Sequence, residues 1–525
     1  MLGVLGRTGD FVKAQTGKSA LALTAFLGAL AAFSLPPYPF TLLFMVSLPL
    51  VLILLSRAKR GWRAFALGFA FGAGYFGMSL YWVGESFLAQ SNVPHWTAPI
   101  AVVLLVMYMS LFPALAFMIS RNFWGSKWAP RALIFAGIYS FFEWLRGSGE
   151  LGFPWNTTSS IWWPYEEMIQ MTALVGSYGL GALTLLAAGL FVALFDKAVP
   201  RYDRFGMTLM GVLMLAAVAL LGWARLGAVT TEYHEGITLR LVQANIPQRE
   251  KWDPALLRRN LDRHIMLSTP LTAEGTPVRY LVWPETAIPF DVGDPVVRGY
   301  LAEALGDEVT LISGANRYGG EEEDKVFNSV YALAPGGEVL DIYDKVHLVP
   351  FGEYIPFREY LGRMGLNALV VGSSDFSRGA GLKTMKLPGL PRFSPLVCYE
   401  IIFPGNVVAP NENPAWFLNL TNDAWFGVTP GPYQHFEMAR MRAVEEGIPV
   451  VRVAGGGISG VVDPLGRVTG KLGLGQTGFL DVALPRPLVQ KTLYSVYGSI
   501  IFLVMVFAFL TIGIIIKSDP KQDYR

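Results

Sequence analysis

Three reactive side chains in this sequence each come directly after a run of β-prone residues. They are Glu285, Lys345 and Cys398, which follow 280–284, 342–344 and 394–397. Active sites of α/β folds form at the carboxyl ends of strands, so we expect the three side chains to converge there. A glutamate can accept the proton of a thiol, and a lysine can stabilise the thiolate that remains. The set therefore indicates a cysteine nucleophile with its own base and cation.

Cys398 is the only cysteine of the chain, so no disulfide forms within it. A single thiol also excludes the thiolate clusters that hold a structural zinc or an iron–sulfur centre. Each of the three residues has a plain alternative, because a lone cysteine often packs in a core and an isolated glutamate or lysine often lies on the surface. Their shared position after strands favours the chemical interpretation.

The composition predicts a membrane protein with more than one domain. The chain has 525 residues, 52% hydrophobic and only 16% charged, and its formal net charge of +2 gives no basic field for nucleic acid. The apolar residues fall into blocks about the length of a spanning helix. We expect eight transmembrane helices, approximately at 19–35, 40–55, 64–83, 99–119, 131–144, 171–194, 207–223 and 499–516.

Alternate loops between these helices differ in their content of lysine and arginine. Basic residues gather within 7–18, 57–63, 121–131, 197–204 and 517–525, whereas 35–40, 84–96 and 147–170 contain none. Cytoplasmic loops carry the excess of positive charge, so we expect both termini in the cytoplasm and the long segment before the eighth helix outside. The first helix is either a retained anchor or a cleaved signal peptide, because Ala29-Leu30-Ala31 matches a cleavage pattern.

The segment from Tyr233 to about Arg486 reads as a soluble α/β domain, since short β-prone runs alternate with turns and helical stretches. The expected strands are 237–244, 280–283, 310–313, 329–334, 394–397, 416–420, 450–453 and 460–463, with helices at 255–266 and 432–446. We therefore predict a membrane domain over 1–230 with seven transmembrane helices and an external catalytic domain over 231–487. A last transmembrane helix and a cytoplasmic tail occupy 488–525.

Three short motifs resemble those of the nitrilase superfamily, whose members carry a Glu-Lys-Cys triad in an α-β-β-α sandwich. The motifs are Pro284-Glu285, Asp344-Lys345 and Cys398-Tyr399-Glu400. With seven helices before this domain and one after it, the chain resembles the membrane-bound branch of that superfamily, the bacterial apolipoprotein N-acyltransferases. Further matches to this branch are 248–252, 350–356, 419–427 and His435. The resemblance implies a multi-pass helical membrane domain with an external nitrilase-like α/β domain.

The resemblance also implies a role for each motif residue. Cys398 is the nucleophile, Glu285 the general base, and Lys345 the cation that stabilises the oxyanion. The supporting residues are Glu353, Tyr399, Glu400 and Trp252. Glu353 corresponds to the family's second active-site carboxylate. Tyr399 and Glu400 flank the thiol, and the Tyr399 backbone N–H is an expected oxyanion donor. The tryptophan is either a functional residue of a neighbouring loop or a half-buried packing residue.

The implied activity is the transfer of an acyl chain from a phospholipid, through a cysteine thioester, to the α-amine of the diacylglyceryl cysteine that begins an apolipoprotein. We expect the inner membrane of a Gram-negative bacterium as its location, with the catalytic domain in the periplasm. The expected partners are the phospholipid donor, the apolipoprotein acceptor and the lipid bilayer, with no nucleic acid, and we expect a monomer. No cofactor or metal is needed, because the ester supplies the energy.

Other interpretations stay open on the sequence alone. A membrane-anchored nitrilase-type amidase shares the first chemical step and uses water as the acceptor, so the triad does not separate the two enzymes. A transporter with an external binding domain is less favoured, because its broken helices with intramembrane charges are weakly represented. The apolar segment 357–371 is either a core helix or an arm that enters the lipid. Glu143 is either an interfacial carboxylate or a buried functional one.

Overall fold

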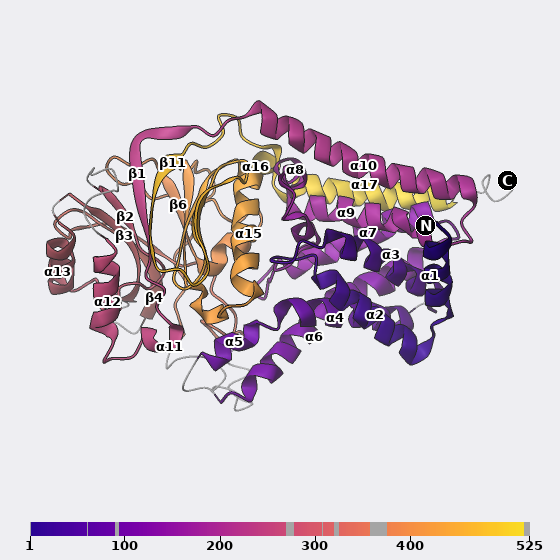
Figure 1. The fold of residues 1–525 in the computed structure, drawn as a ribbon, viewed down its shortest axis with the longest axis horizontal. Helices are drawn as coiled ribbons and strands as arrows, with labels where there is room; N and C mark the ends of the chain where they lie inside the picture. The colour runs from indigo at the N-terminus through magenta and orange to yellow at the C-terminus, as the bar shows by residue number, and fades with distance from the viewer. Residues whose placement is uncertain are drawn as a thin grey trace. The chain divides into compact units, whose positions relative to one another are not determined.

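The chain forms two compact units in its computed structural model (Figure 1), which describes residues 2–59, 61–89, 94–268, 278–306, 308–319, 325–357 and 375–518. The first unit consists of Met1–Gly84, Trp96–Val229 and Thr492–Arg525, and the second of Glu85–His95 and Thr230–Lys491. All of the predicted external loop 84–96 except its two end residues therefore belongs to the second unit.

The first unit is helical throughout its described residues. Its long helices are α1 (Leu2–Ala14), α2 (Gly17–Ala32), α3 (Thr41–Arg57), α4 (Trp62–Leu80), α6 (Thr97–Phe123), α7 (Trp128–Arg146), α9 (Thr172–Phe195), α10 (Arg201–Ala228) and α17 (Ser499–Ser518). Short helical turns complete it: η1 (Thr158–Trp162), α8 (Glu166–Ile169) and α16 (Leu493–Tyr497), while α5 (Val83–Leu88) leads into the second unit. Each of the eight predicted transmembrane segments coincides with one long helix, and α1 was not predicted.

Four helices among the described residues are long and apolar enough to cross a membrane. They are α6, α9, α10 and Ser499–Lys517 of α17. The apolar helices α2 and α3 have only 16 and 17 residues, and α4 and α7, with 19 residues each, are less apolar. The presence of apolar membrane helices is thus supported, and the number of eight spans stays a prediction.

Glu143 of α7 is 5% exposed, so its carboxylate is buried within the first unit. Its Oε1 accepts hydrogen bonds of 2.9 Å from both the backbone N–H and the hydroxyl of Thr158, the first residue of η1. Arg146 lies 3.8 Å from the same oxygen. The carboxylate therefore ties α7 to η1 within the first unit.

Two β-sheets form the centre of the second unit. Its strands are β1 (Tyr233–Gln243), β2 (Tyr280–Val282), β3 (Thr310–Gly319), β4 (Lys325–Leu333), β5 (Val339–Asp344), β6 (Phe393–Val397), β7 (Trp416–Thr421), β8 (Val450–Ala454), β9 (Ser459–Val462), β10 (Val468–Leu472) and β11 (Gly478–Pro485). One sheet has the order β11-β1-β2-β3-β4-β5 and the other β10-β9-β8-β7-β6. The strands β1-β2-β3 and β6-β7-β8 run parallel, and the remaining neighbours are antiparallel.

The two sheets face each other between two layers of helices. Strand β4 contacts β6 and β1 contacts β8, so side chains of both sheets meet in the middle. Helices α12 (Leu257–Met266) and α13 (Pro295–Leu305) lie on the outer side of the first sheet, and α15 (Pro430–Glu446) packs against β8 of the second (Figure 1). The predicted α-β-β-α order is therefore present.

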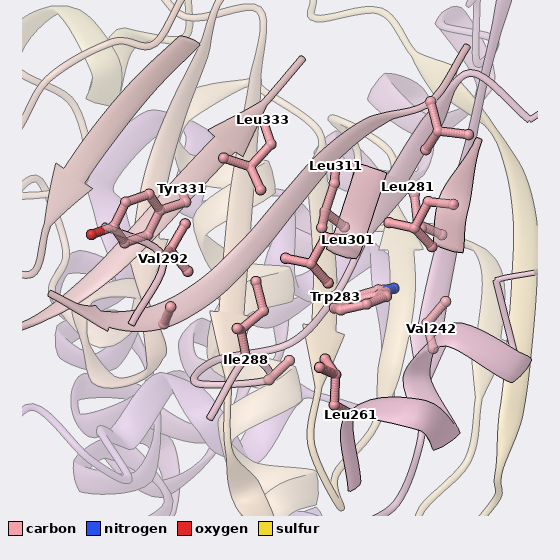
Figure 2. Close-up of a cluster of buried hydrophobic side chains, with 14 residues drawn as sticks. Val242, Leu261, Leu281, Trp283, Ile288, Val292, Leu301, Leu311, Tyr331 and Leu333 are labelled. Carbon is pink, nitrogen blue, oxygen red and sulfur yellow. The ribbon is translucent and has the colours of Figure 1, made fainter. Parts of the chain in front are cut away.

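A buried apolar cluster holds α12 and α13 against the first sheet (Figure 2). Leu261 of α12 and Leu301 of α13 pack there with Leu281 of β2 and Trp283. Trp283 directly follows the carboxyl end of this strand. The Trp283 indole donates a 2.9 Å hydrogen bond to the Ser268 hydroxyl. Because Trp283 is two residues from Glu285, this packing also fixes the start of the loop that carries the glutamate.

We expect Leu301→Ala to lower the free energy of unfolding by about 2–5 kcal/mol, because it leaves a cavity in a close-packed cluster. The matched control is Val296→Ala on the same helix, whose side chain is 76% exposed and should change stability by less than about 0.5 kcal/mol. Denaturant unfolding of the detergent-purified protein measures both values. Equal losses in the two variants would contradict this assignment of the core.

Candidate active site

Cys398 sits at the sharp turn between β6 and the short helix η3 (Cys398–Ile402). Its φ of +53° is unusual for a residue with a side chain and costs roughly 1–2 kcal/mol. Such strain persists only where the surrounding structure holds it, and it is typical of functional positions. The thiol is 8% exposed and lies at the carboxyl end of a parallel strand, as the sequence predicted.

A buried polar network holds the backbone of Cys398 in this conformation. Its carbonyl accepts hydrogen bonds of 3.2 Å from both Asn419 Nδ2 and His435 Nε2. Asp423 lies 2.9 Å from His435 Nδ1 and accepts a hydrogen bond of 2.6 Å from Arg452. The network therefore connects the nucleophile's turn to β7, α15 and β8.

Glu285 follows β2 and is 6% exposed. Its Oε1 accepts a 2.7 Å hydrogen bond from Asn328 of β4, and its backbone carbonyl accepts one of 3.0 Å from Lys251. Its Oε2 is buried and has no hydrogen-bond partner among the residues that the structure describes. One carboxylate oxygen is thus fixed, and the other is available to accept a proton.

Lys345 follows β5 and is 1% exposed. Its ammonium donates a 2.7 Å hydrogen bond to Glu353 Oε1, which also accepts from Asn328 at 3.3 Å. Glu353 Oε2 accepts from the Val349 backbone N–H at 2.8 Å. Asn328 therefore bridges the two predicted active-site carboxylates, Glu285 and Glu353.

Glu400, two residues after the thiol, has a fully buried carboxylate. It accepts hydrogen bonds from the backbone N–H groups of Val397 and Val346 at 2.7 Å and of His347 at 3.0 Å. The Tyr343 hydroxyl donates to it as well, at 2.9 Å from Oε1. Glu400 thus joins the turn of Cys398 to the loop of Lys345.

The charges around the thiol influence one another's protonation. Burial raises the pKa of Cys398 to about 12, with a further increase from the Glu285 charge and an opposing decrease from Lys345. Burial alone would lower the pKa of Lys345, but Glu353, Glu285 and Cys398 together raise it above its usual value. At neutral pH the resting thiol is therefore protonated beside a charged lysine, and it would need a base to act as a nucleophile.

Comparison with known proteins matches both units. The family description "Apolipoprotein N-acyltransferase N-terminal domain" matches residues 27–190, and "Carbon-nitrogen hydrolase" matches 238–494. A relative from Rhodopseudomonas palustris, named apolipoprotein N-acyltransferase, is 34% identical over 99% of both chains. The chain belongs to the apolipoprotein N-acyltransferase family. It is thus an acyltransferase with a nitrilase-like α/β domain.

Other relatives agree with this family assignment. A protein of the same name from Bradyrhizobium diazoefficiens is 37% identical, with 92% of each chain covered. A crystal structure of an amidase from Nesterenkonia sp. aligns with a TM-score of 0.35 and 21% identity, covering 49% of this chain and 94% of that one.

The remaining predicted residues lie in different surroundings. Tyr399 is 5% exposed and its ring packs edge-on against Phe403, with 4.9 Å between the ring centres. Trp252 is 42% exposed at the end of the short helix α11 (Gln248–Lys251), which agrees with either of its two predicted roles. The predicted arm 357–371 lies outside the described residues except for Phe357, which is 63% exposed. Within the described ranges, no group of three or more metal-binding side chains is placed to hold an ion.

A cavity of about 350 Å³ in the second unit lies beside the Glu285 loop. Asn245 and Ile246 line both this cavity and a small one at Glu285. The wall of the larger cavity combines apolar and charged side chains, including Glu85, Leu88, Arg249, Trp425 and Val428. The α5 segment is held there by hydrogen bonds from Arg249 to the Leu88 carbonyl, 3.0 Å, and from the Ser86 hydroxyl to the Trp425 carbonyl, 3.2 Å.

Two residues that donate hydrogen bonds to Glu285 were not recognised as site residues from the sequence, namely Asn328 and Lys251. Asn328 lies inside a strand, and nothing in its spacing connects it to Glu285, 43 residues away. Lys251 belongs to the quoted motif 248–252 but received no role. A lysine that directly follows Gln248, Arg249 and Glu250 gives no local signal of burial, although Lys251 is only 8% exposed.

Gly314 of β3 should be essential for the position of Glu285. A Cβ at this position would lie 2.4 Å from the Thr286 backbone N and 2.6 Å from the Glu285 Cα. We expect Gly314→Ala to displace the glutamate and to lower the acyl-transfer rate by about 100-fold, the cost of a shift near 1 Å. Gly299→Ala on α13, where an added Cβ meets nothing within 4 Å, should leave the rate unchanged. A full rate in Gly314→Ala would refute this positioning.

Proposed function

We propose that the protein transfers an acyl chain from a phospholipid, through a thioester on Cys398, to the α-amine of the diacylglyceryl cysteine at the start of an apolipoprotein. The observation that carries the proposal is the near full-length match to relatives named apolipoprotein N-acyltransferase, combined with a buried thiol beside Glu285 and Lys345. The roles of the individual residues are part of this proposal.

In the first half-reaction, Glu285 Oε2 accepts the thiol proton as Cys398 Sγ attacks the ester carbonyl of the phospholipid. The carbonyl oxygen becomes an oxyanion, which Lys345 and the backbone N–H of Tyr399 stabilise. When the tetrahedral intermediate collapses, the C–O bond breaks and Glu285 returns its proton to the leaving oxygen. The products are a lysophospholipid and an acyl thioester on Cys398.

In the second half-reaction, the α-amine of the acceptor attacks the thioester carbonyl. Glu285 accepts a proton from the amine nitrogen, the C–S bond breaks, and the thiolate recovers the proton from Glu285. The acceptor leaves as an amide. Glu353 and Asn328 support both halves, because they fix Lys345 and Oε1 of Glu285 within hydrogen-bond distance.

Burial favours a transferase over the amidase alternative. An acyl-enzyme that waits for a lipid-linked amine must survive in the presence of water, and Cys398 is only 8% exposed. The mixed apolar and charged walls of the cavity near Glu285 suit an amphiphile that has a chain and a polar head. The amidase would share the thioester and differ only in the rate at which water removes it.

The proposed setting is the bacterial inner membrane, with eight spans and the domain 231–487 in the periplasm. The support is the asymmetry of lysine and arginine between alternate loops, together with the apolar helices. The phospholipid donor, the acceptor and the bilayer are then all accessible from one side. We propose a monomer and a lipid-contacting role for 357–371.

Without an acceptor, the purified protein should accumulate about one acyl group per chain when it is incubated with a phospholipid. Intact-protein mass spectrometry should find a hydroxylamine-labile acyl mass on the wild type and none on Cys398→Ser. Glu285→Gln should slow both half-reactions by about 10²- to 10⁴-fold, because proton transfer serves each. Glu412→Gln, an exposed glutamate of the same unit, is the control and should react at the wild-type rate.

Addition of a diacylglyceryl-cysteinyl peptide should discharge the thioester into an amide, and overall kinetics should be ping-pong. The same peptide with a blocked α-amine should leave the thioester intact, since its nitrogen is no longer nucleophilic. If free fatty acid were instead released rapidly without any peptide, the amidase would replace the acyltransferase as the better explanation.

The topology predicts opposite accessibility for two engineered thiols in a Cys398→Ala background. Val489→Cys, at a position 98% exposed in the second unit, should react with a membrane-impermeant maleimide in intact spheroplasts. Lys59→Cys, in the basic loop after α3, should react only after the membrane is opened. The reverse pattern of labelling would invert the proposed orientation.

A further inference from the structure

Lys251 is a second buried lysine close to the predicted nucleophile. It ends α11 and is 8% exposed, although an ammonium group is rarely buried without compensation. Its Nζ donates a 3.0 Å hydrogen bond to the backbone carbonyl of Glu285. With the Asn422 amide turned so that its oxygen faces the lysine, that oxygen lies 3.1 Å from Nζ.

The ammonium of Lys251 is not neutralised by these contacts. Its hydrogen-bond partners among the described residues are both neutral oxygens. The charges that interact with it are those of Glu285 and Cys398, each of which favours the charged ammonium. His264, which also faces it, is neutral at neutral pH because burial lowers the pKa of that imidazole to about 4. The positive charge is therefore directed at the thiol and its base.

A count of charges shows what Lys251 adds to the chemistry. Lys345 pairs with Glu353 at 2.7 Å, so this ion pair is close to neutral overall. When the thiol proton moves to Glu285, the thiolate becomes the unpaired negative charge of the cluster. With a charged Lys251, the cluster has no net charge before or after this transfer. Without it, one negative charge stays buried and uncompensated, which is costly in a medium of low dielectric constant.

We propose that Lys251 is a positioning residue of the active site, which holds the Glu285 turn by its carbonyl and supplies the second positive charge that stabilises the Cys398 thiolate. This inference rests on the proposed role of Cys398 as the nucleophile. The charged groups that act on the thiol are Glu285, Lys345 and Asp423, and the charge of the thiolate acts in turn on Lys251. Of these, Asp423 is held in an ion pair with Arg452 at 2.6 Å.

The rate of alkylation by iodoacetamide tests the inference, because Cys398 is the only thiol of the chain and no lipid or acceptor is needed. The rate is followed by intact mass from pH 6 to 11 on the full-length protein in detergent. We expect Lys251→Met and Lys251→Gln to react about 10-fold more slowly than wild type at pH 7, which corresponds to a thiol pKa raised by about one unit. The glutamine variant keeps a hydrogen-bond donor and removes only the charge.

The shape of the profile separates a charge effect from a structural one. Burial lowers the pKa of Lys251 to about 8, so the wild-type lysine loses its charge above that pH. The rates of wild type and variants should therefore differ below pH 8 and converge above about pH 10. Lys386→Met, at an exposed lysine of the same unit, should follow the wild-type curve throughout.

Asn422→Asp gives an independent test that keeps Lys251 in place. The substitution puts a carboxylate next to Nζ and neutralises the ammonium, so alkylation at pH 7 should slow in the same direction. Unchanged profiles in Lys251→Gln and Asn422→Asp would overturn the inference, even if both variants melted at lower temperature. Because alkylation does not depend on acyl transfer, this result is distinguishable from a failure of the proposed function.

Discussion

The hydrogen bonds to the Glu400 carboxylate connect the edge strands of the two sheets, which are not paired with each other in the described structure. Strand β5 ends one sheet and β6 ends the other, and their carboxyl ends carry Lys345 and Cys398. Backbone N–H groups from both ends converge on this one buried carboxylate. Although burial raises the pKa of Glu400, the same donors oppose that rise and compensate the charge. The relative position of lysine and thiol is therefore set by a side chain rather than by a sheet.

The same solution recurs throughout the site, where each buried charge is held by a polar group from a different element. Asn328 donates to both Glu285 and Glu353, so two carboxylates share one amide. Such a network keeps the groups close, while Oε2 of Glu285 and the amide oxygen of Asn328 have no hydrogen-bond partner among the described residues. Because an amide oxygen is not basic, the carboxylate oxygen of Glu285 is the natural acceptor for a proton.

Much of the second unit was predictable because its strands are short apolar runs bounded by turns. All eight predicted strands are present, and only the end of β5, 342–344, was anticipated as a β-prone run. Strands β10 and β11 were missed, because glycines within 470–478 are typical of turns and both strands are partly exposed. Glu285, Lys345 and Cys398 were identifiable because each directly follows a strand. Asn328 and Lys251 were not, because their roles come from contacts across the fold and leave no local pattern. Length and hydropathy decide whether a helix can be identified as a membrane span. Helices α2, α3, α4 and α7 are either too short or not apolar enough.

The segment Glu85–His95 belongs to the second unit although more than a hundred residues of the first unit separate it from β1. Its α5 end supplies part of the wall of the large cavity, through Leu88 and its hydrogen bond with Arg249. A gene fragment that begins near residue 230 would therefore encode an incomplete fold, with an exposed cavity wall. Arg249 would lose its carbonyl acceptor on Leu88, and the Trp425 carbonyl would lose the Ser86 hydroxyl. The loop between α4 and α6 is therefore as much a part of the catalytic unit as any segment after residue 230.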